Sequence, residues 1–203
     1  MKFTVRPPQV LRSYYKGSIW RMDKNEPTIY LTFDDGPVPE ITPWVLDVLN
    51  NYNVKATFFC VGENIIKHPE IFQRILSEGH QVGNHTFNHL KGWEVSSTVY
   101  HKNVEQCQQF TKTDLFRPPY GRIKKSQMKK LMDDYRIVFW DVLSHDYDRL
   151  TTSKKCLGNS IKYSRNGSII VFHDSLKASR NLKFALPQYI EHFLKLSYKF
   201  ATL

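Results

Sequence analysis

Short apolar runs alternate with amphipathic segments from residue 28 to the end of the 203-residue chain. The runs are rich in β-branched and aromatic residues, which favour strands, and between them apolar residues recur at helical spacing. The pattern predicts strands at 28–33, 54–61, 80–85, 114–121, 136–141, 167–173 and 198–203, and helices at 41–52, 69–79, 97–111, 124–135, 151–164 and 181–196. Strands that alternate with helices in this way predict a parallel α/β fold, in which helices cover both faces of apolar strands.

The same pattern divides the chain into an N-terminal extension, residues 1–27, and one domain, residues 28–203. We expect so short an extension to pack across one end of the fold, although its Tyr14, Tyr15 and Trp20 among basic residues also suit a membrane or a partner. The first residues lack the apolar centre of a signal peptide, and no run approaches the ~20 apolar residues of a membrane span. We therefore expect a protein that is cytoplasmic or peripheral to a membrane.

Charge and cysteine content narrow the classes of partner. Lys and Arg number 29 against 19 Asp and Glu, and the resulting net charge of +10 attracts nucleic acid, anionic glycans or anionic lipid. The basic residues are dispersed and accompany no nucleic-acid motif, so we predict no nucleic-acid partner and leave a peripheral contact with an anionic membrane or glycan open. Cys60, Cys107 and Cys156 lie far apart, which argues against a disulfide framework and against a thiolate zinc site.

Charged and titratable side chains gather where the predicted strands end, at positions where a core does not require them. They are Asp34, Asp35, His85, His89, Arg117, Asp141, Asp146, His173 and Asp174. In a barrel or an open sheet of alternating strands and helices, the carboxyl ends of the strands form the face that carries active sites. Each residue taken singly has an ordinary structural explanation, such as a cap or a surface ion pair. Their joint placement favours a site.

The spacing of the histidines indicates a metal. His85 and His89 lie four residues apart, so a helical turn would bring both imidazoles to one side, where Asp35 offers a third ligand atom. Two histidines and a carboxylate with an open position are typical of a catalytic metal site, where the cation lowers the pKa of its water to about 7. Asp34 is then free to act as general base, and the cation would keep both adjacent acids ionised.

Two residues from other strands complete this hypothesis. Arg117 is expected to pair with Asp34 and to hold it charged. His173 titrates near neutral pH, so it can protonate a leaving group. Carboxylate and imidazole ligands suit zinc, which we expect, and also admit cobalt, nickel, iron or manganese.

Five segments, in order along the chain, resemble the motifs of one enzyme family. They are TFDDGP (32–37), HTFNH (85–89), RPPYG (117–121), WDVLSHDYD (140–148) and VFH (171–173). They are similar to the motifs of NodB-type polysaccharide deacetylases, carbohydrate esterase family four, over roughly residues 28–203. The resemblance implies a distorted (β/α) barrel related to the TIM barrel, with about seven parallel strands. It also implies metal-dependent removal of N-acetyl groups from a glycan that contains N-acetylglucosamine.

The resemblance further implies roles for single residues. Asp34 would be the general base, Arg117 the residue that positions it and His173 the general acid. The implied metal ligands are Asp35, His85 and His89. The backbone N–H of Tyr120 would stabilise the tetrahedral oxyanion. The implied substrate contacts are Pro118, Tyr120, Trp140 and Val171, with Val171 against the acetyl methyl group.

The chain departs from the family pattern at two places. Asp146 is followed by Tyr147 where the family often has Trp, and Val171 stands where it usually has Leu. We expect Asp146, rather than Asp141, to contact Arg117, and we expect the acetyl pocket to be slightly wider.

Two other functions stay open at this point. One is a related C–N hydrolase that acts on a formamido-sugar lipid or on a cyclic imide or ureido compound, which the lack of a signal-peptide pattern favours. The other is a glycan-binding module of weak activity. The presence of an acid, a base and an open metal site together argues against such a module, because binding alone does not need them.

Overall fold

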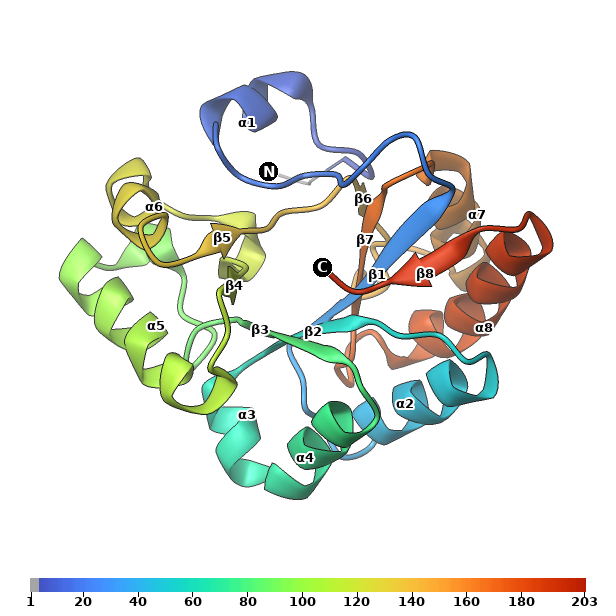
Figure 1. The fold of residues 1–203 in the computed structure, drawn as a ribbon, viewed down its shortest axis with the longest axis horizontal. Helices are drawn as coiled ribbons and strands as arrows, with labels where there is room; N and C mark the ends of the chain where they lie inside the picture. The colour runs from blue at the N-terminus through green and yellow to red at the C-terminus, as the bar shows by residue number, and fades with distance from the viewer. Residues whose placement is uncertain (1–3) are drawn as a thin grey trace.

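The computed structural model describes residues 4–203 as a curled parallel sheet surrounded by helices (Figure 1). Seven strands lie in the order β5-β4-β3-β2-β1-β7-β6, and an eighth, β8, pairs with the start of β1. Every pairing between these strands is parallel. The predicted α/β class, the distorted barrel and its seven parallel strands are therefore confirmed.

The elements follow the predicted order with two changes. The strands are β1 Thr28–Asp34, β2 Thr57–Cys60, β3 Gln81–Asn84, β4 Leu115–Phe116, β5 Arg136–Ile137, β6 Val142–Leu143, β7 Ile169–His173 and β8 Lys199–Ala201. The helices are α1 Gln9–Tyr14, α2 Thr42–Asn51, α3 Gly62–Lys67, α4 Pro69–Ser77, α5 Ser97–Thr111, α6 Lys125–Leu131, α7 Ser153–Tyr163 and α8 Ser179–Lys195. The expected strand at 136–141 is shortened to β5, and three short elements, the helices α1 and α3 and the strand β6, were not predicted.

Strand β1 shows how side-chain alternation places the chemistry. Ile29, Leu31 and Phe33 are completely buried in the cluster that includes residues of α2 and α8 outside the sheet. Successive side chains of a strand point to opposite faces, so Thr32 and Asp34 point into the barrel. The strand therefore ends with a carboxylate inside the barrel, at the carboxyl end of the sheet, where the apolar interior gives way to a cavity.

The N-terminal extension packs along the side of the sheet that its two edge strands leave open. Figure 1 shows α1 across the gap between β5 and β6. Tyr15 and Trp20 are buried and stack on Phe139, with ring centroids 4.9 Å and 4.3 Å apart. Ile19 forms a parallel bridge with Val138. The extension thus supplies part of the barrel core. Within residues 4–203, no helix has both the length and the apolar character that crossing a membrane requires.

Candidate active site

A cavity of about 410 Å³ opens at the carboxyl ends of the strands. Eight of the predicted site residues line it: Asp34, Asp35, His85, His89, Tyr120, Trp140, Val171 and His173. Gly121, Arg122, Leu143, Tyr147, Ser175 and Lys177 complete the wall. Arg117 and Asp146 lie buried behind this wall, and Pro118 is also buried and does not line the cavity. We call this cavity the catalytic pocket.

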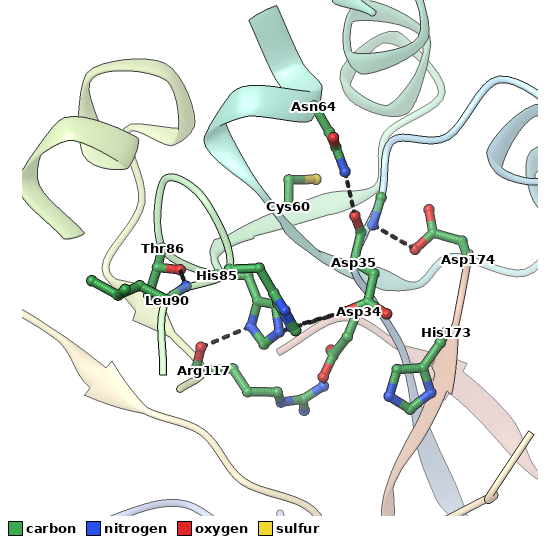
Figure 2. Close-up of polar contacts among 12 residues, drawn as sticks. Asp34, Asp35, Cys60, Asn64, His85, Thr86, Leu90, Arg117, His173 and Asp174 are labelled. Carbon is green, nitrogen blue, oxygen red and sulfur yellow. Dashed lines mark hydrogen bonds and ion pairs between the residues drawn. The ribbon is translucent and has the colours of Figure 1, made fainter. Parts of the chain in front are cut away.

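Asp35, His85 and His89 converge on one point, as predicted for a metal site. One potential ligand atom from each of the three residues lies within 4.8 Å of the other two. Asp35 Oδ1 is 3.2 Å from His89 Nε2 and 3.9 Å from His85 Nε2. Figure 2 shows His85 facing the two adjacent carboxylates from the neighbouring strand connection. Two imidazoles and a carboxylate around one point are a donor set that suits a divalent transition metal.

The two histidines reach this arrangement by a different backbone from the expected one. They lie on an irregular loop after β3 and not on a helical turn. Thr86 and His89 adopt left-handed backbone conformations, with φ of 66° and 56°. The loop is held by the Asn84 side chain, whose Oδ1 accepts the Thr86 N–H at 2.9 Å, and by Thr86 Oγ1, which accepts the Leu90 N–H at 2.9 Å. The imidazole centroids still lie 5.1 Å apart.

The protonation state of His85 suits metal binding. Its ring is 2% exposed, and burial, with the nearby charge of Asp34 opposing, lowers the pKa of His85 to about 4. The imidazole is therefore neutral at pH 7. Nδ1 lies 2.8 Å from the carbonyl oxygen of Arg117, so Nδ1 carries the proton and donates a hydrogen bond to that oxygen. Nε2 is left with a lone pair directed at Asp35 and His89, which is the geometry of a metal ligand with a supporting outer contact.

Asp35 is held in place by two residues that sequence reasoning assigned no role. Its backbone has φ of 88°, and its carbonyl oxygen accepts a 2.7 Å hydrogen bond from Asn64 Nδ2. The next residue, Gly36, donates its N–H to Asp174 Oδ1 at 3.0 Å, and Thr42 donates to Asp174 Oδ2 at 2.6 Å. Figure 2 shows Asn64 and Asp174 bound to the backbone of this turn from two sides. Asp174 follows His173 directly in sequence, whereas no signal in the chain pointed to Asn64.

Charge keeps Asp35 ionised. Burial by itself would raise the pKa of Asp35, but the hydrogen bond from His89 and the nearby charge of His173 outweigh burial and lower it well below its usual range. An ionised carboxylate between two imidazoles fits a cation. We therefore find that the residues present suit a metal ion of the kind that the sequence predicts.

Asp34 is paired with a buried arginine, as predicted. Arg117 Nη1 donates to Asp34 Oδ1 at 2.6 Å, and the guanidinium is completely buried over the Phe59 ring. The remaining guanidinium donors reach Thr32 Oγ1 at 2.8 Å and the carbonyl oxygens of Val138 and Phe139 at 3.3 Å and 3.0 Å. These four hydrogen bonds hold the guanidinium against its partner. Arg117 therefore orients one oxygen of Asp34 and leaves the other oxygen without a bond from the guanidinium.

Asp146 contacts His173 and not Arg117, which corrects the expected pairing. Asp146 Oδ2 accepts the backbone N–H of His173 at 2.7 Å, and Oδ1 lies 2.8 Å from the imidazole Nδ1. Burial lowers the pKa of His173, but the charge and hydrogen bond of Asp146 outweigh it and raise the pKa to about 9. The imidazole is therefore protonated at neutral pH, with Nδ1 bound to Asp146 and Nε2 available to a substrate.

Asp141 belongs to a different part of the molecule. It precedes β6 and is completely buried, with Arg12 at 2.7 Å and Arg165 at 3.2 Å from its carboxylate. Ser168, just before the start of β7, donates to Asp141 at 2.8 Å. His173 ends the same strand, five residues and roughly 16 Å further on. The expectation that all the polar clusters share one face was wrong for Asp141.

Tyr120 forms the lip of the pocket. It lies in a short 3₁₀ turn with φ of 59°, its side chain is 45% exposed, and its ring centroid is 4.6 Å from that of His89. Gly121 follows with φ of 60°, and a Cβ atom there would lie 2.4 Å from Trp140 Cη2. The backbone thus turns sharply against the Trp140 ring, which brings this turn to the rim of the pocket.

Comparisons with known proteins identify the family of this chain. Residues 21–137 match the family model described as "Polysaccharide deacetylase". Over 191 residues the chain is 32% identical to a peptidoglycan-N-acetylglucosamine deacetylase of Bacillus cereus, a match that covers 91% of this chain and 90% of that protein. It is 32% identical over 171 residues to a chitooligosaccharide deacetylase of Azorhizobium caulinodans, covering 78% of this chain and 79% of the relative.

A solved structure shares the whole fold. The Bc1960 peptidoglycan N-acetylglucosamine deacetylase, in complex with a naphthalenyl N-oxidanyl-benzamide, superposes with a TM-score of 0.88 at 31% identity. The superposition covers 95% of this chain and 93% of that one, so it extends well beyond the part of the chain that the family model matches. Other relatives are longer proteins, and the chain spans 57% and 34% of two of them.

Proposed function

Because the chain belongs to the polysaccharide deacetylase family, we propose that it removes N-acetyl groups from a glycan that contains N-acetylglucosamine. It is a hydrolase of amide C–N bonds. The proposal rests on one observation, which is that three different functional groups meet at one pocket. These are a metal triad, a carboxylate oriented by Arg117, and an imidazole kept protonated by Asp146.

We assign the metal to Asp35, His85 and His89, and zinc is the metal we propose. When bound, the cation supplies Lewis-acid polarisation of a carbonyl and acidifies water. Asp34 adjoins Asp35 in sequence but is not one of the three proposed ligands, and Arg117 engages only its Oδ1. It is therefore free to accept a proton.

The residues of the chain then divide the proton transfers between them. Asp34 accepts a proton from the attacking water, whose oxygen forms a bond to the acetamide carbon. The backbone N–H of Tyr120 donates a hydrogen bond to the oxyanion that develops on the former carbonyl oxygen. His173 gives its Nε2 proton to the amide nitrogen as the C–N bond breaks. The products are acetate and a free sugar amine.

The wall of the pocket suits a sugar acetamide. Val171 is completely buried at its floor, and Trp140 and Tyr147 supply aromatic faces. Aromatic rings beside a few polar groups are a common lining of ligand sites. The side chain of Val171 is smaller than that of leucine, so it leaves room for the methyl end of an acetyl group. An acetyl group is what both kinds of named relative remove.

The test is acetate release by metal-stripped protein from N-acetylglucosamine oligosaccharides and from peptidoglycan, before and after zinc or cobalt is added back. We expect acetate only with metal, and none from Asp34→Asn. Because Asp34 is not a ligand, Asp34→Asn is expected to bind metal as the native protein does. Loss of metal from this variant would contradict the assigned roles.

The same assay separates the alternatives. A protein that binds metal stoichiometrically but releases no acetate would point to another C–N bond, such as that of a formamido-sugar lipid or a cyclic imide. Glycan binding without turnover of any acetamide, with metal supplied, would point to a binding module.

A further inference from the structure

A second groove adjoins the catalytic pocket and has no role in the chemistry above. Its volume is about 880 Å³, twice that of the pocket, and Tyr147 lines both. One wall is the N-terminal segment, and the other is the face of α7 with the loop before it. The groove is lined by Thr4, Val5, Arg6, Pro8, His145, Tyr147, Asp148, Leu150, Thr151, Lys155, Asn159 and Tyr163. We call it the α7 groove.

The two cavities share a wall at Tyr147. The Tyr147 ring lies 4.8 Å from the His173 ring on one side and 6.0 Å from the His145 ring on the other, measured between centroids. Leu143, in the wall of the pocket, donates its N–H to the carbonyl oxygen of Val5, in the wall of the groove, at 2.8 Å. The groove therefore adjoins the pocket at Tyr147, and a sugar chain that extended from the pocket past this residue would reach it.

One face of α7 supplies the far wall. Lys155, Asn159 and Tyr163 follow one another at intervals of four residues, so they line up along the helix over about 12 Å. Lys155 and Asn159 offer hydrogen-bond donors, and the Tyr163 ring offers a flat surface. Such groups are of the kind that bind sugars and their substituents. Within the part of the chain that the structure describes, no carboxylate lies within ion-pair distance of Lys155.

The groove is electrostatically positive. Asp148 is its only acidic lining residue, and that carboxylate accepts the N–H of Leu150 at 2.9 Å within its own turn. At the other end, Arg6 lies 3.7 Å from Asp141, whose single charge is already paired with Arg12 and Arg165. Three guanidinium groups around one buried carboxylate leave a net positive field there. An occupant of this groove is therefore expected to carry negative charge.

We propose that the α7 groove is an accessory subsite for a glycan strand, in which Lys155 binds the carboxylate of a sugar next to the one that is deacetylated. This inference rests on the proposed deacetylase function and specifies its substrate class. It predicts a preference for a carboxylate-bearing glycan, such as a peptidoglycan strand without stem peptides, in which alternate sugars carry a free lactyl carboxylate, over a neutral chitooligosaccharide. The two named relatives act on one and on the other of these classes.

The experiment uses three substrates of equal length with the full-length, metal-loaded protein. They are a peptidoglycan tetrasaccharide without stem peptides, the same compound with its lactyl carboxylates reduced to alcohols, and chitotetraose. The variants are Lys155→Glu and, as matched control, Lys154→Glu, which makes the same charge change on the adjacent exposed residue of α7 outside the groove. The readout is kcat/KM for each substrate, expressed as the ratio of the acidic to the reduced tetrasaccharide.

We expect the native protein to favour the acidic tetrasaccharide, and Lys155→Glu to lower this ratio by about fivefold or more through KM. Lys154→Glu should keep the native ratio. Equal effects of the two variants, or no preference in the native protein, would overturn the proposal. Binding to anionic phospholipid vesicles that Lys155→Glu abolishes, with the ratio unchanged, would overturn it in favour of a membrane surface.

The failure of the subsite differs from failure of the deacetylase function. If no substrate releases acetate, the function proposed above fails, and calorimetric binding of the acidic and reduced tetrasaccharides still tests the groove. Tighter binding of the acidic compound, lost in Lys155→Glu and kept in Lys154→Glu, would support the subsite by itself. Equal binding of both compounds would reject it.

Discussion

Asp146 holds His173 with both oxygens of its carboxylate, one on the backbone N–H at 2.7 Å and one on the imidazole Nδ1 at 2.8 Å. The double contact fixes the ring orientation and determines which nitrogen faces the pocket. It also places a buried negative charge directly against the imidazole. The pKa of His173, which burial alone would lower, is thereby raised to about 9. The His173 imidazole therefore stays protonated through the neutral pH range.

Asp146→Asn should move the alkaline limb of the rate profile. The native protein is expected to lose activity as pH rises through about 9, where His173 gives up its proton. Removing the negative charge lowers the pKa of His173, so the limb should shift to lower pH by about one pH unit or more. The measurement is kcat against pH for the metal-loaded protein. Asp114→Asn, at an exposed carboxylate paired with Arg136, is the control, and an identical profile for both variants would contradict the assignment.

Asn64→Ala should weaken metal binding without removing a ligand. Asn64 holds the carbonyl oxygen of Asp35, whose left-handed backbone needs an external contact to persist. Loss of this outer contact is expected to cost about tenfold in zinc affinity. Competition with a chelator measures it. Glu63→Ala, which removes only an exposed ion pair with Lys67 on the same helix, should bind zinc as the native protein does. Equal affinities for all three proteins would show that Asn64 does not support the site.

Gly121→Ala should disturb the pocket and the fold together. The residue has φ of 60°, and the added Cβ would lie 2.4 Å from the Trp140 ring. We expect a loss of about 1–3 kcal/mol in the free energy of unfolding and a higher KM, because Trp140 must shift in the pocket wall.

Gly158→Ala is the control, since a Cβ on this α7 residue meets nothing within 4 Å. It should leave stability unchanged or raise it by up to about 1 kcal/mol. If Gly121→Ala had the melting temperature and the KM of the native protein, the close approach of this turn to Trp140 would be refuted.

Because of His80, the protein is expected to lose stability in mild acid. Its buried ring accepts the Ala56 N–H at Nδ1, 3.2 Å away, and burial, with the charge of Lys55, lowers the pKa of His80 to about 4. Between about pH 6.5 and 4, His80 is protonated in the unfolded chain but stays neutral in the native state. The free energy of unfolding should therefore fall as pH drops from about 6.5 to about 4, by roughly 1–3 kcal/mol.

The variant that tests this is His80→Asn, whose amide oxygen can accept the same N–H but does not titrate. Denaturant unfolding at several pH values should show a smaller acid loss for His80→Asn than for the native protein. His192→Asn, a substitution on α8, is expected to follow the native curve. An acid loss of the same size in His80→Asn would assign the effect to other groups.

Local pattern alone determined the order of the elements and the identity of most of the site. Alternation along β1 places Phe33 against the helices and Asp34 inside the barrel, and this depends only on the pleat of one strand. Parallel strands bring their carboxyl ends to one edge, so Asp35, His85 and His173 had to lie near one another once the fold class was known.

Tertiary structure decided which of these neighbours touch. The HxxxH spacing suggested a helical turn, yet His85 and His89 meet through a loop with left-handed residues. Asp146 was expected at Arg117 but lies against His173, and Asp141 faces the arginines of the N-terminal extension. Each of these contacts joins residues far apart in the chain or depends on a loop. Register between strands and the path of irregular backbone set such distances, and neither is encoded in the spacing of residues along a single segment.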